Sequence, residues 1–229
     1  MLKPKKKISK KEIKQDKLVT RFMQVETWTL DNQKLLTYVG LGVAAVILIV
    51  FVWSDRLSTM ESEGASRLGA ILPVYNNGDM QQAIDGVPAR GTFGLRSIVE
   101  EYGSTDAGNL AKLLLSNALL SQDKPEEALG YLEDIDPPSR LMESAVLSAR
   151  GVALEKLGEH EDAARFFERA VSTDPTNPLS SERLVQAAAN FAKSGERDRA
   201  GDVLKTLKKQ YPQSAAAREV ERYMAEFAS

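Results

Sequence analysis

Cysteine is absent from the 229-residue chain, and histidine occurs once, as His160. Without a thiol the chain can form no disulfide framework, thiolate zinc site, iron–sulfur cluster, cysteine nucleophile or lipidated cysteine anchor. One imidazole cannot build a histidine metal cluster, and it supplies a Ser-His-Asp triad poorly. We expect His160 to lie in a turn between paired helices and to be inert. The composition therefore predicts a noncatalytic protein with no cofactor and no metal.

The formal net charge is only −2, but the charge is distributed unevenly. Residues 1–34 carry ten basic and four acidic side chains, whereas residues 35–53 carry none. Residues 54–229 carry 20 basic and 28 acidic side chains. The chain therefore divides into a basic tail, an uncharged segment and an acidic body. Such a body disfavours nucleic-acid binding as the main role.

The uncharged segment Leu35–Trp53 is long enough to cross a bilayer. As a helix, its 19 residues would reach about 28 Å, close to the thickness of the hydrocarbon core. Tyr38 and Trp53, near its two ends, are residue types that favour the headgroup region. A buried core helix would usually show a polar stripe, and this segment shows none. We predict a transmembrane helix at residues 35–53.

A cleaved signal peptide is the main alternative for this segment. The basic region before it is 34 residues long, however, and Trp53-Ser54-Asp55-Arg56 replaces the usual small-x-small cleavage site. The segment is therefore predicted to be a permanent anchor. The excess of Lys and Arg before it predicts a cytoplasmic N-terminus. We accordingly expect a single-pass protein of a bacterial inner membrane with a periplasmic C-terminal domain.

The basic tail, residues 1–34, has apolar residues at helical spacing from about residue 12 onward. Leu18, Phe22, Val25 and Trp28 could form a helix on the inner leaflet, or they could extend the membrane helix into the cytosol. Both interpretations remain open. The lysine-rich start suits anionic lipid and membrane topology better than nucleic acid.

The acidic body repeats a helical pattern with a period of about 35 residues. In its clearest copy, small residues, apolar residues and a proline have the spacing of a 34-residue tetratricopeptide repeat (TPR): Gly151, Leu154, Gly158, Ala163, Phe167, Ala170 and Pro175. Small residues let two helices cross closely, and Gly158 supplies the left-handed conformation that ends the first helix. Similar units surround Ala128 and Ala200.

These repeats predict an all-α fold: one N-terminal transmembrane helix, then a TPR solenoid of three to four helical pairs with a C-terminal capping helix. In the first, degenerate pair, Asp85–Gly91 interrupts the second helix. We expect four segments: the tail at 1–34, the membrane helix at 35–53, a linker and the degenerate repeat at 54–108, and the regular repeats with the cap at 109–229.

A stack of helical pairs has a concave surface lined by the first helix of each pair. The repeat alignment predicts the following groove residues: Leu113, Asn117, Leu120, Val152, Glu155, Lys156, Val185, Ala189 and Lys193, with Leu110 and Ala192 beside them. Leu110 and Leu113 could instead pack against the degenerate pair. The lining is mostly apolar, and only Asn117, Lys156 and Lys193 could hold a terminal carboxylate. We therefore expect an extended apolar segment or a helix of a partner as the ligand.

The chain resembles the YfgM-like family. The likeness lies in the architecture and in three segments, Ala83–Gly86, Glu100–Leu115 and Glu126–Asp136. The resemblance implies an ancillary subunit of the SecYEG translocon that pairs with the membrane-anchored chaperone PpiD. It further implies that the repeats bind the periplasmic part of the chaperone and that the anchor lies near the translocon. The competing hypothesis is a structural or assembly subunit of another inner-membrane complex, in envelope biogenesis or energy transduction.

Overall fold

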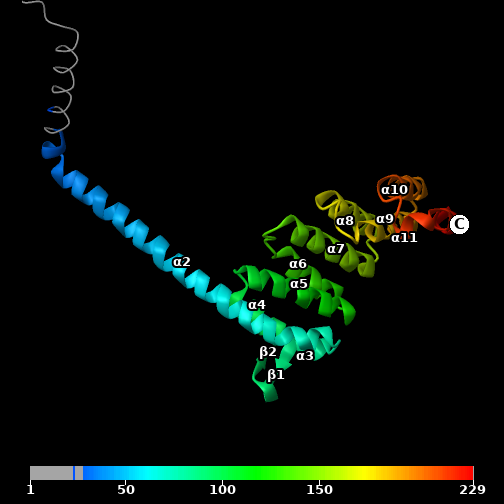
Figure 1. Cartoon of the computed structure of the whole chain (residues 1–229), viewed down its shortest axis with the longest axis horizontal. Coiled ribbons are helices and arrows are strands. Elements are labelled where there is room, and N and C mark those ends of the chain that lie inside the picture. The colour runs from blue at the N-terminus through cyan, green and yellow to red at the C-terminus, as the bar shows by residue number, and fades with distance from the viewer. Residues whose placement is uncertain (1–22, 24–27, 229) are drawn as a thin grey trace, which may run out of the picture. The chain divides into compact units, whose positions relative to one another are not determined.

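The computed structural model describes residue 23 and residues 28–228. It divides the chain into two compact units, Met1–Arg56 and Leu57–Ser229. Most of the described part of the first unit belongs to helix α2 (Gln33–Asn76), which also enters the second unit (Figure 1). The amphipathic helix proposed for the tail falls almost wholly outside the described residues, so both interpretations of it stay open.

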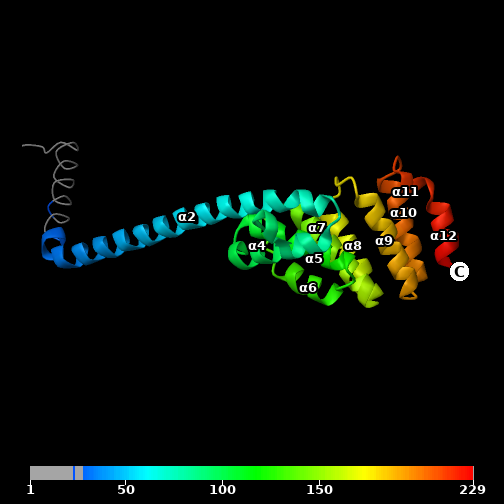
Figure 2. The same cartoon turned by 90° about the horizontal axis from the view of Figure 1, so that it is seen from below.

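Three regular helical pairs follow one another in the second unit (Figures 1 and 2). They are α5 (Asp106–Ser121) with α6 (Pro125–Glu133), α7 (Arg140–Leu157) with α8 (His160–Thr173), and α9 (Ser180–Lys193) with α10 (Arg197–Gln210). Short helices α11 (Ala215–Arg218) and α12 (Val220–Ala228) close the stack against α9 and α10. The predicted all-α fold with a capped solenoid is confirmed.

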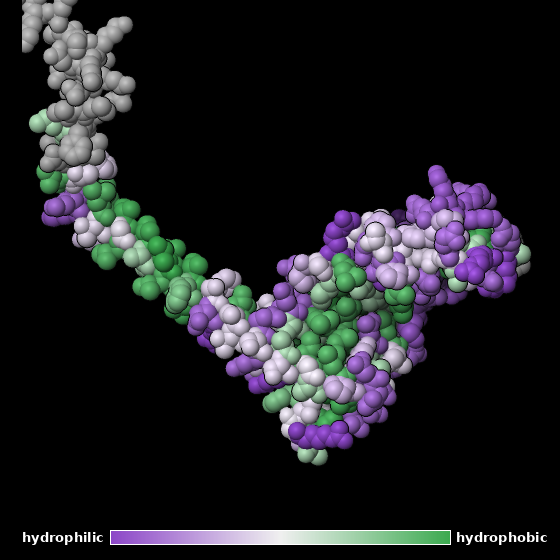
Figure 3. All heavy atoms as spheres, viewed as in Figure 1, coloured by the Kyte–Doolittle hydropathy of each residue, from purple (hydrophilic) through white to green (hydrophobic). Residues whose placement is uncertain are grey.

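The apolar part of α2 is uncovered. No residue of its most apolar 18-residue window is buried, and the large apolar side chains of residues 35–53 expose between 39% and 72% of their surface. Figure 3 shows this part of the helix as a long apolar surface. No described residue packs on it, unlike the core helix of a soluble domain. By length and composition, α2 is able to cross a membrane.

After residue 53 the helix α2 continues to Asn76. Its last part packs as the first helix of the degenerate pair, with Leu68, Ile71 and Val74 buried at three-residue spacing. Gly64 allows close approach to α4 (Leu95–Tyr102), since a Cβ at this position would lie 3.1 Å from the Tyr102 side chain. The helical period of the apolar residues thus extends beyond the uncharged segment.

A hairpin separates the two pieces of the second helix of this pair, α3 (Met80–Asp85) and α4. Strand β1 (Gly86–Val87) pairs antiparallel with β2 (Thr92–Phe93), and the 3-10 turn η1 (Pro88–Arg90) joins them. The backbones at its base are so close that a Cβ on Gly94 would lie 2.3 Å from the Ile84 carbonyl oxygen. The interruption predicted at Asp85–Gly91 therefore coincides with an inserted hairpin, which needs glycine where backbones meet.

The turns inside the regular pairs have the backbone conformation that their sequences indicate. Gly158 and Gly195 have φ of +81° and +90°, in the left-handed region. The turn between α5 and α6 uses Asp123 instead, with φ of +60°, and aspartate is one of the few residues that tolerate this region. Inside the second pair, a Cβ on Gly151 would lie 3.0 Å from the Phe167 ring. The expected close helix crossing is present.

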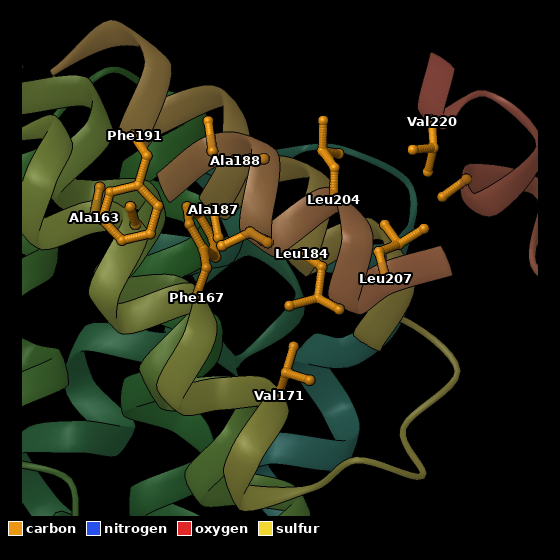
Figure 4. Close-up of a cluster of buried hydrophobic side chains, with 14 of the residues drawn as sticks. Ala163, Phe167, Val171, Leu184, Ala187, Ala188, Phe191, Leu204, Leu207 and Val220 are labelled. Carbon is orange, nitrogen blue, oxygen red and sulfur yellow. The ribbon is translucent and has the colours of Figure 1, made fainter. Parts of the chain in front are cut away.

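The core of the last two regular pairs is continuous with the cap (Figure 4). Phe167 of α8 and Phe191 of α9 are fully buried, together with Leu204 and Leu207 of α10 and Val220 of α12. Truncating a buried Phe to Ala typically costs about 3–5 kcal/mol. This cluster therefore holds successive helices in fixed register and fixes the exposed face of α7 and α9.

Candidate protein-binding groove

The first helices of the three regular pairs carry all nine predicted groove residues. Seven of them are accessible: Asn117, Lys156 and Lys193 are exposed, and Val152, Glu155, Val185 and Ala189 are half-buried. They lie on α5, α7 and α9, so the repeat periodicity places accessible side chains at equivalent positions of neighbouring pairs. We define the groove by these seven residues, with Leu110 and Ala192 beside them.

Leu113 and Leu120 do not contribute accessible surface, because they are only 8% and 5% exposed. Leu113 packs with Leu132, Ile135 and Val146, in a cluster formed by the first and second regular pairs. Leu120 belongs to the cluster that contains α2 and α4 residues of the degenerate pair. Packing against the degenerate pair, the alternative for Leu110 and Leu113, is not seen for Leu113, which packs against the second regular pair. Leu120, for which this packing was not expected, makes it instead.

The floor of the groove is apolar. Val152 and Val185 are half-buried, each at the margin of a core cluster, and Leu110 keeps 40% of its surface exposed. Figure 3 shows apolar side chains gathered over α5 and α7 on the face in view. Such a floor can bury apolar side chains of a partner at about 25 cal/mol per Å².

Each of the two groove lysines forms an ion pair with a residue of the preceding helical pair. Lys156 Nζ lies 2.9 Å from Asp123 Oδ1, and Lys193 Nζ lies 2.7 Å from Glu155 Oε1. These surface pairs each contribute at most about 1 kcal/mol to stability. They nevertheless neutralise the cations that a peptide carboxylate would need. The arrangement favours an uncharged apolar ligand over a terminal carboxylate along this part of the groove.

Asn117 connects the groove to the degenerate pair. Its side chain forms a hydrogen bond with Tyr75, near the end of α2. Burial raises the pKa of Tyr75, and the hydrogen bond from Asn117 opposes that rise. Tyr75 therefore remains a neutral phenol at ordinary pH, and Asn117 is already engaged by the protein itself.

A hollow of about 280 Å³ lies at the end of the groove nearest the cap. Val185 of α9 lines it together with Ala215, Ala216 and Tyr223 of the cap, and Glu182 and Glu219 lie at its sides. Two further cavities lie near the ends of helices: one of about 590 Å³ between α8, α9 and α10, and one of about 560 Å³ beside the loop between α6 and α7.

His160 has a structural contact that its sequence context did not indicate. It is the first residue of α8 and is half-buried, and its Nδ1 lies 2.9 Å from Oδ1 of the fully buried Asn190 of α9. The contact joins two successive pairs. Among the described residues, no group of three His, Cys, Asp or Glu side chains is placed to hold a metal ion.

A second polar contact inside the stack was not predicted from the sequence either. The Arg183 guanidinium is 6% exposed and donates to Ser144 Oγ at 2.8 Å, and this hydroxyl donates to the Ala170 carbonyl at 2.7 Å. Burial lowers the pKa of Arg183, while Asp174 and Glu182 favour its charged form. The contact connects α7, α8 and α9. The sequence indicates this contact only by placing a charged residue, Arg183, beside the apolar stripe of α9.

The fold and the groove together define a helical-repeat module of the kind that binds proteins. In agreement, residues 144–177 match the family model described as tetratricopeptide repeat, and residues 184–214 match a second model with the same description. The first of these matches begins and ends where the glycine, alanine and proline spacing places one unit. TPR units are therefore present in the chain.

The comparison with curated proteins gives partial relatives. Over 80 residues the chain is 35% identical to the carbamoyl phosphate synthase large chain, C-terminal section, of Methanopyrus kandleri, which is 35% of this chain and 14% of that protein. Over 93 residues it is 32% identical to the uncharacterised protein y4yS of Sinorhizobium fredii, which is 39% of this chain and 50% of that protein. The chain thus spans half or less of the length of these relatives.

Solved structures show the same architecture. A protein of Podosopora anserina, described as a kinesin light chain with nearly identical TPR-like repeats, superposes with a TM-score of 0.56 at 16% identity. The match covers 73% of this chain and 86% of that one. A variant of the same protein gives a TM-score of 0.57 at 16% identity. At this identity the likeness concerns the fold alone.

Proposed function

We propose that the chain is a noncatalytic, membrane-anchored scaffold that binds other polypeptides along the groove of α5, α7 and α9. In this proposal α2 crosses a bacterial inner membrane once, residues 1–34 are cytoplasmic, and the second unit is periplasmic. The residues that would contact the partner are Asn117, Val152, Glu155, Lys156, Val185, Ala189 and Lys193.

One observation carries the proposal: the repeats present an accessible face in which Val152, Val185 and Ala189 form an apolar floor and the lysines are already paired with Asp123 and Glu155. Such a face has no reactive group to act on a substrate, but it can bury a partner's apolar side chains. The TPR matches support this interpretation, since TPR folds typically serve as interaction modules. The uncovered apolar part of α2 supports a membrane anchor.

For the partner, we propose a PpiD-like periplasmic chaperone together with a SecYEG-like translocon. This finer assignment is supported by the resemblance of three chain segments and of the overall architecture to the YfgM-like family. It makes the chain an ancillary subunit at the site of protein export, where the groove would hold the chaperone close to emerging chains. If the chain is instead a subunit of a different inner-membrane complex, the assignment to the translocon and chaperone is wrong.

Site-specific photocrosslinking in living cells tests the groove and its partner together. A photoreactive amino acid replaces Val152 or Val185 in the groove, and the matched control replaces Gly130, which is exposed on the second helix α6. We expect crosslinks to chaperone and translocon subunits from the groove positions and none from the control. Crosslinks to another complex would overturn the export assignment. Equal crosslinking from Gly130 would overturn the groove.

A further inference from the structure

The net negative charge of the second unit comes from its first half. Residues 57–136 contain 13 acidic and five basic side chains, whereas residues 137–229 contain 14 of each. The acidic half includes α5 and α6, and the neutral half includes the later pairs. A partner that spans the groove therefore meets an acidic surface at one end only. This asymmetry indicates charged recognition at that end.

The cavity of about 560 Å³ lies in this acidic half, beside the N-terminal end of α5 and the loop that leads into α7. Asp106, Asp134 and Asp136 line it. Lys112 is 5% exposed and is fully engaged, since its Nζ lies 2.5 Å from the Asp134 carboxylate and 2.8 Å from the Asp134 carbonyl oxygen. Within the described residues, Asp106 and Asp136 have no cation as a partner.

The loop that carries Asp136 is held in place. Asn109 is 7% exposed, and its Nδ2 donates to the Asp136 carbonyl at 2.9 Å, while its Oδ1 accepts from the Asp136 N–H at 3.4 Å. Pro137 and Pro138 follow directly and restrict the backbone further. The Asp136 carboxylate therefore projects from a fixed backbone, and a partner would lose little free energy in ordering it.

The edge formed by the start of α5 and the loop before α7 carries more acidic than basic side chains around the cavity. Glu61 of α2 accepts from the Ala107 N–H at 3.1 Å and so covers the positive end of the α5 dipole. Arg140, at the start of α7, donates through Nε to the Thr173 carbonyl at 3.0 Å and is directed to the end of α8. Of the described residues that line the cavity, Lys112 is the only cation beside Asp106, Asp134 and Asp136.

Apolar side chains follow these carboxylates closely in the chain: Leu110 lies one helical turn after Asp106 on α5, and Leu141 is at the start of α7, after the loop that carries Asp136. The structure exposes four large apolar side chains in the described part of the second unit, and two of them, Leu110 at 40% and Leu141 at 61%, lie at the N-terminal ends of α5 and α7. Met142 and Ala145 are half-buried over the cluster that contains Leu113. The leucines can pack with apolar side chains of a peptide, and the spaced carboxylates can pair with its separated cations. Among the described residues, no group of acids here is placed to hold one metal ion.

We propose that the edge formed by Asp106, Leu110, Asp136 and Leu141 docks a basic amphipathic helix of the partner polypeptide. Its leucine-like side chains would pack on Leu110 and Leu141, and its Lys or Arg side chains would pair with Asp106 and Asp136. The inference rests on the proposed scaffold function and specifies the chemistry of the segment that the groove selects. The helix would lie with its basic side toward the acidic half of the repeats.

Three fluorescent 18-residue peptides test this inference with the full chain in detergent micelles. They share one helical pattern of leucines and differ at three positions, which hold Lys, Gln or Glu. We expect fluorescence anisotropy to give about tenfold tighter binding for the Lys peptide than for the Glu peptide, with the difference shrinking as salt is raised. Equal binding of all three peptides overturns the charge recognition and leaves the scaffold function standing. Binding of none overturns both.

Charge-neutralising variants test where recognition occurs. Asp106→Asn with Asp136→Asn should remove most of the preference for the Lys peptide while leaving the Gln peptide unchanged. The matched control, Glu126→Gln with Glu133→Gln, removes the same charge from exposed positions of α6 in the same half of the unit. Circular dichroism confirms that both variants fold. If the control variant loses the preference for the Lys peptide to the same extent, the overall negative charge of the acidic half causes the preference, and the proposed docking edge is wrong.

Discussion

Gly151 shows how a single residue sets the spacing of a helical pair. A side chain there would meet the Phe167 ring at 3.0 Å, whereas no atom lies within 4 Å of a Cβ on Gly130, which is also helical. We expect Gly151→Leu to destabilise the second unit by about 1–3 kcal/mol through overpacking. Gly130→Leu should be stabilising by up to about 1 kcal/mol, because leucine is the better helix former. Urea unfolding measures both, and similar destabilisation by the two variants would contradict the packing argument.

The protonation of Tyr102 is tied to the fold. It is 1% exposed, and its hydroxyl bonds Glu101 at 3.0 Å and Glu63 at 3.2 Å. The Arg67 guanidinium lies 5.0 Å from its ring and 4.1 Å from that of Phe93 in the hairpin. Burial, assisted by Glu101, raises the pKa of Tyr102 to about 12. The group therefore holds the hairpin, α2 and α4 together only as a neutral phenol.

This shift predicts an alkaline loss of stability. The unfolded chain ionises Tyr102 at its ordinary pKa of 10.0, but the folded chain resists until about pH 12. The contribution is complete below pH 10 and declines as the pH rises toward 12. We expect wild type to be more stable than Tyr102→Phe at pH 8 and to lose that advantage as the pH rises from 10 toward 12. Urea unfolding of both proteins at each pH gives the difference in their free energies of unfolding, in which the effects of the other titrating groups cancel. A difference that does not change with pH would contradict the raised pKa of Tyr102.

At the scale of elements, α11 and α12 are the part that makes the last pair stable. They cover Leu204 and Leu207 of α10 by adding Ala216, Ala217 and Val220 to one core. Removing residues 212–229 would expose that core, and we expect a loss of at least about 3 kcal/mol, with hydrogen exchange rising first in α9 and α10. Removing only residues 228–229 is the control. Unchanged protection in α10 of the longer deletion would show that the cap is dispensable.

The regular elements were predictable because their signals are local. Gly158 and Gly195 mark turns through their backbone freedom, and Gly151 marks a crossing through its size. The hairpin was not predictable, since two-residue strands have no period and depend on the close approach of Gly94 to Ile84. The sequence alone does not show that one helix runs from the uncharged segment into the degenerate pair, because the stripe of Leu68, Ile71 and Val74 is recognised only when its packing partner is known.

The same limit applies to the groove. Repeat register places the candidate residues at equivalent positions on α5, α7 and α9, but it does not distinguish surface from core at Leu113 and Leu120. Their burial depends on how closely each neighbouring pair approaches, which is a tertiary property. The pairing of Lys156 with Asp123 is likewise invisible in sequence, because the two residues are 33 positions apart and come from different pairs. Periodicity therefore defines a face, and packing decides which of its residues remain available.

At the scale of the whole molecule, the absence of cysteine makes the proposed topology directly measurable. Single cysteines can be placed by Lys5→Cys in the tail and by Gln213→Cys at an exposed position before the cap. In intact bacterial cells, a membrane-impermeant maleimide should label only the second variant, and permeabilisation should allow labelling of both. The reverse pattern would place the repeats in the cytoplasm and would exclude a periplasmic partner.

The anchor itself is tested by one charge in the apolar part of α2. Ile47 is 62% exposed, and Lys34 and Asp55 are the nearest charged residues on either side of the uncharged segment. An arginine near the centre of a membrane helix costs about 2.5–3.5 kcal/mol of insertion free energy. We expect Ile47→Arg to move a large fraction of the protein from the membrane pellet to the supernatant after alkaline carbonate extraction, while Ile47→Leu stays in the pellet. The same substitution should leave peptide binding by the second unit in detergent unchanged, because no groove residue lies on this part of α2. Extraction of wild type by carbonate would show that the apolar surface is covered by another protein instead of lipid, and the anchor proposal would fail.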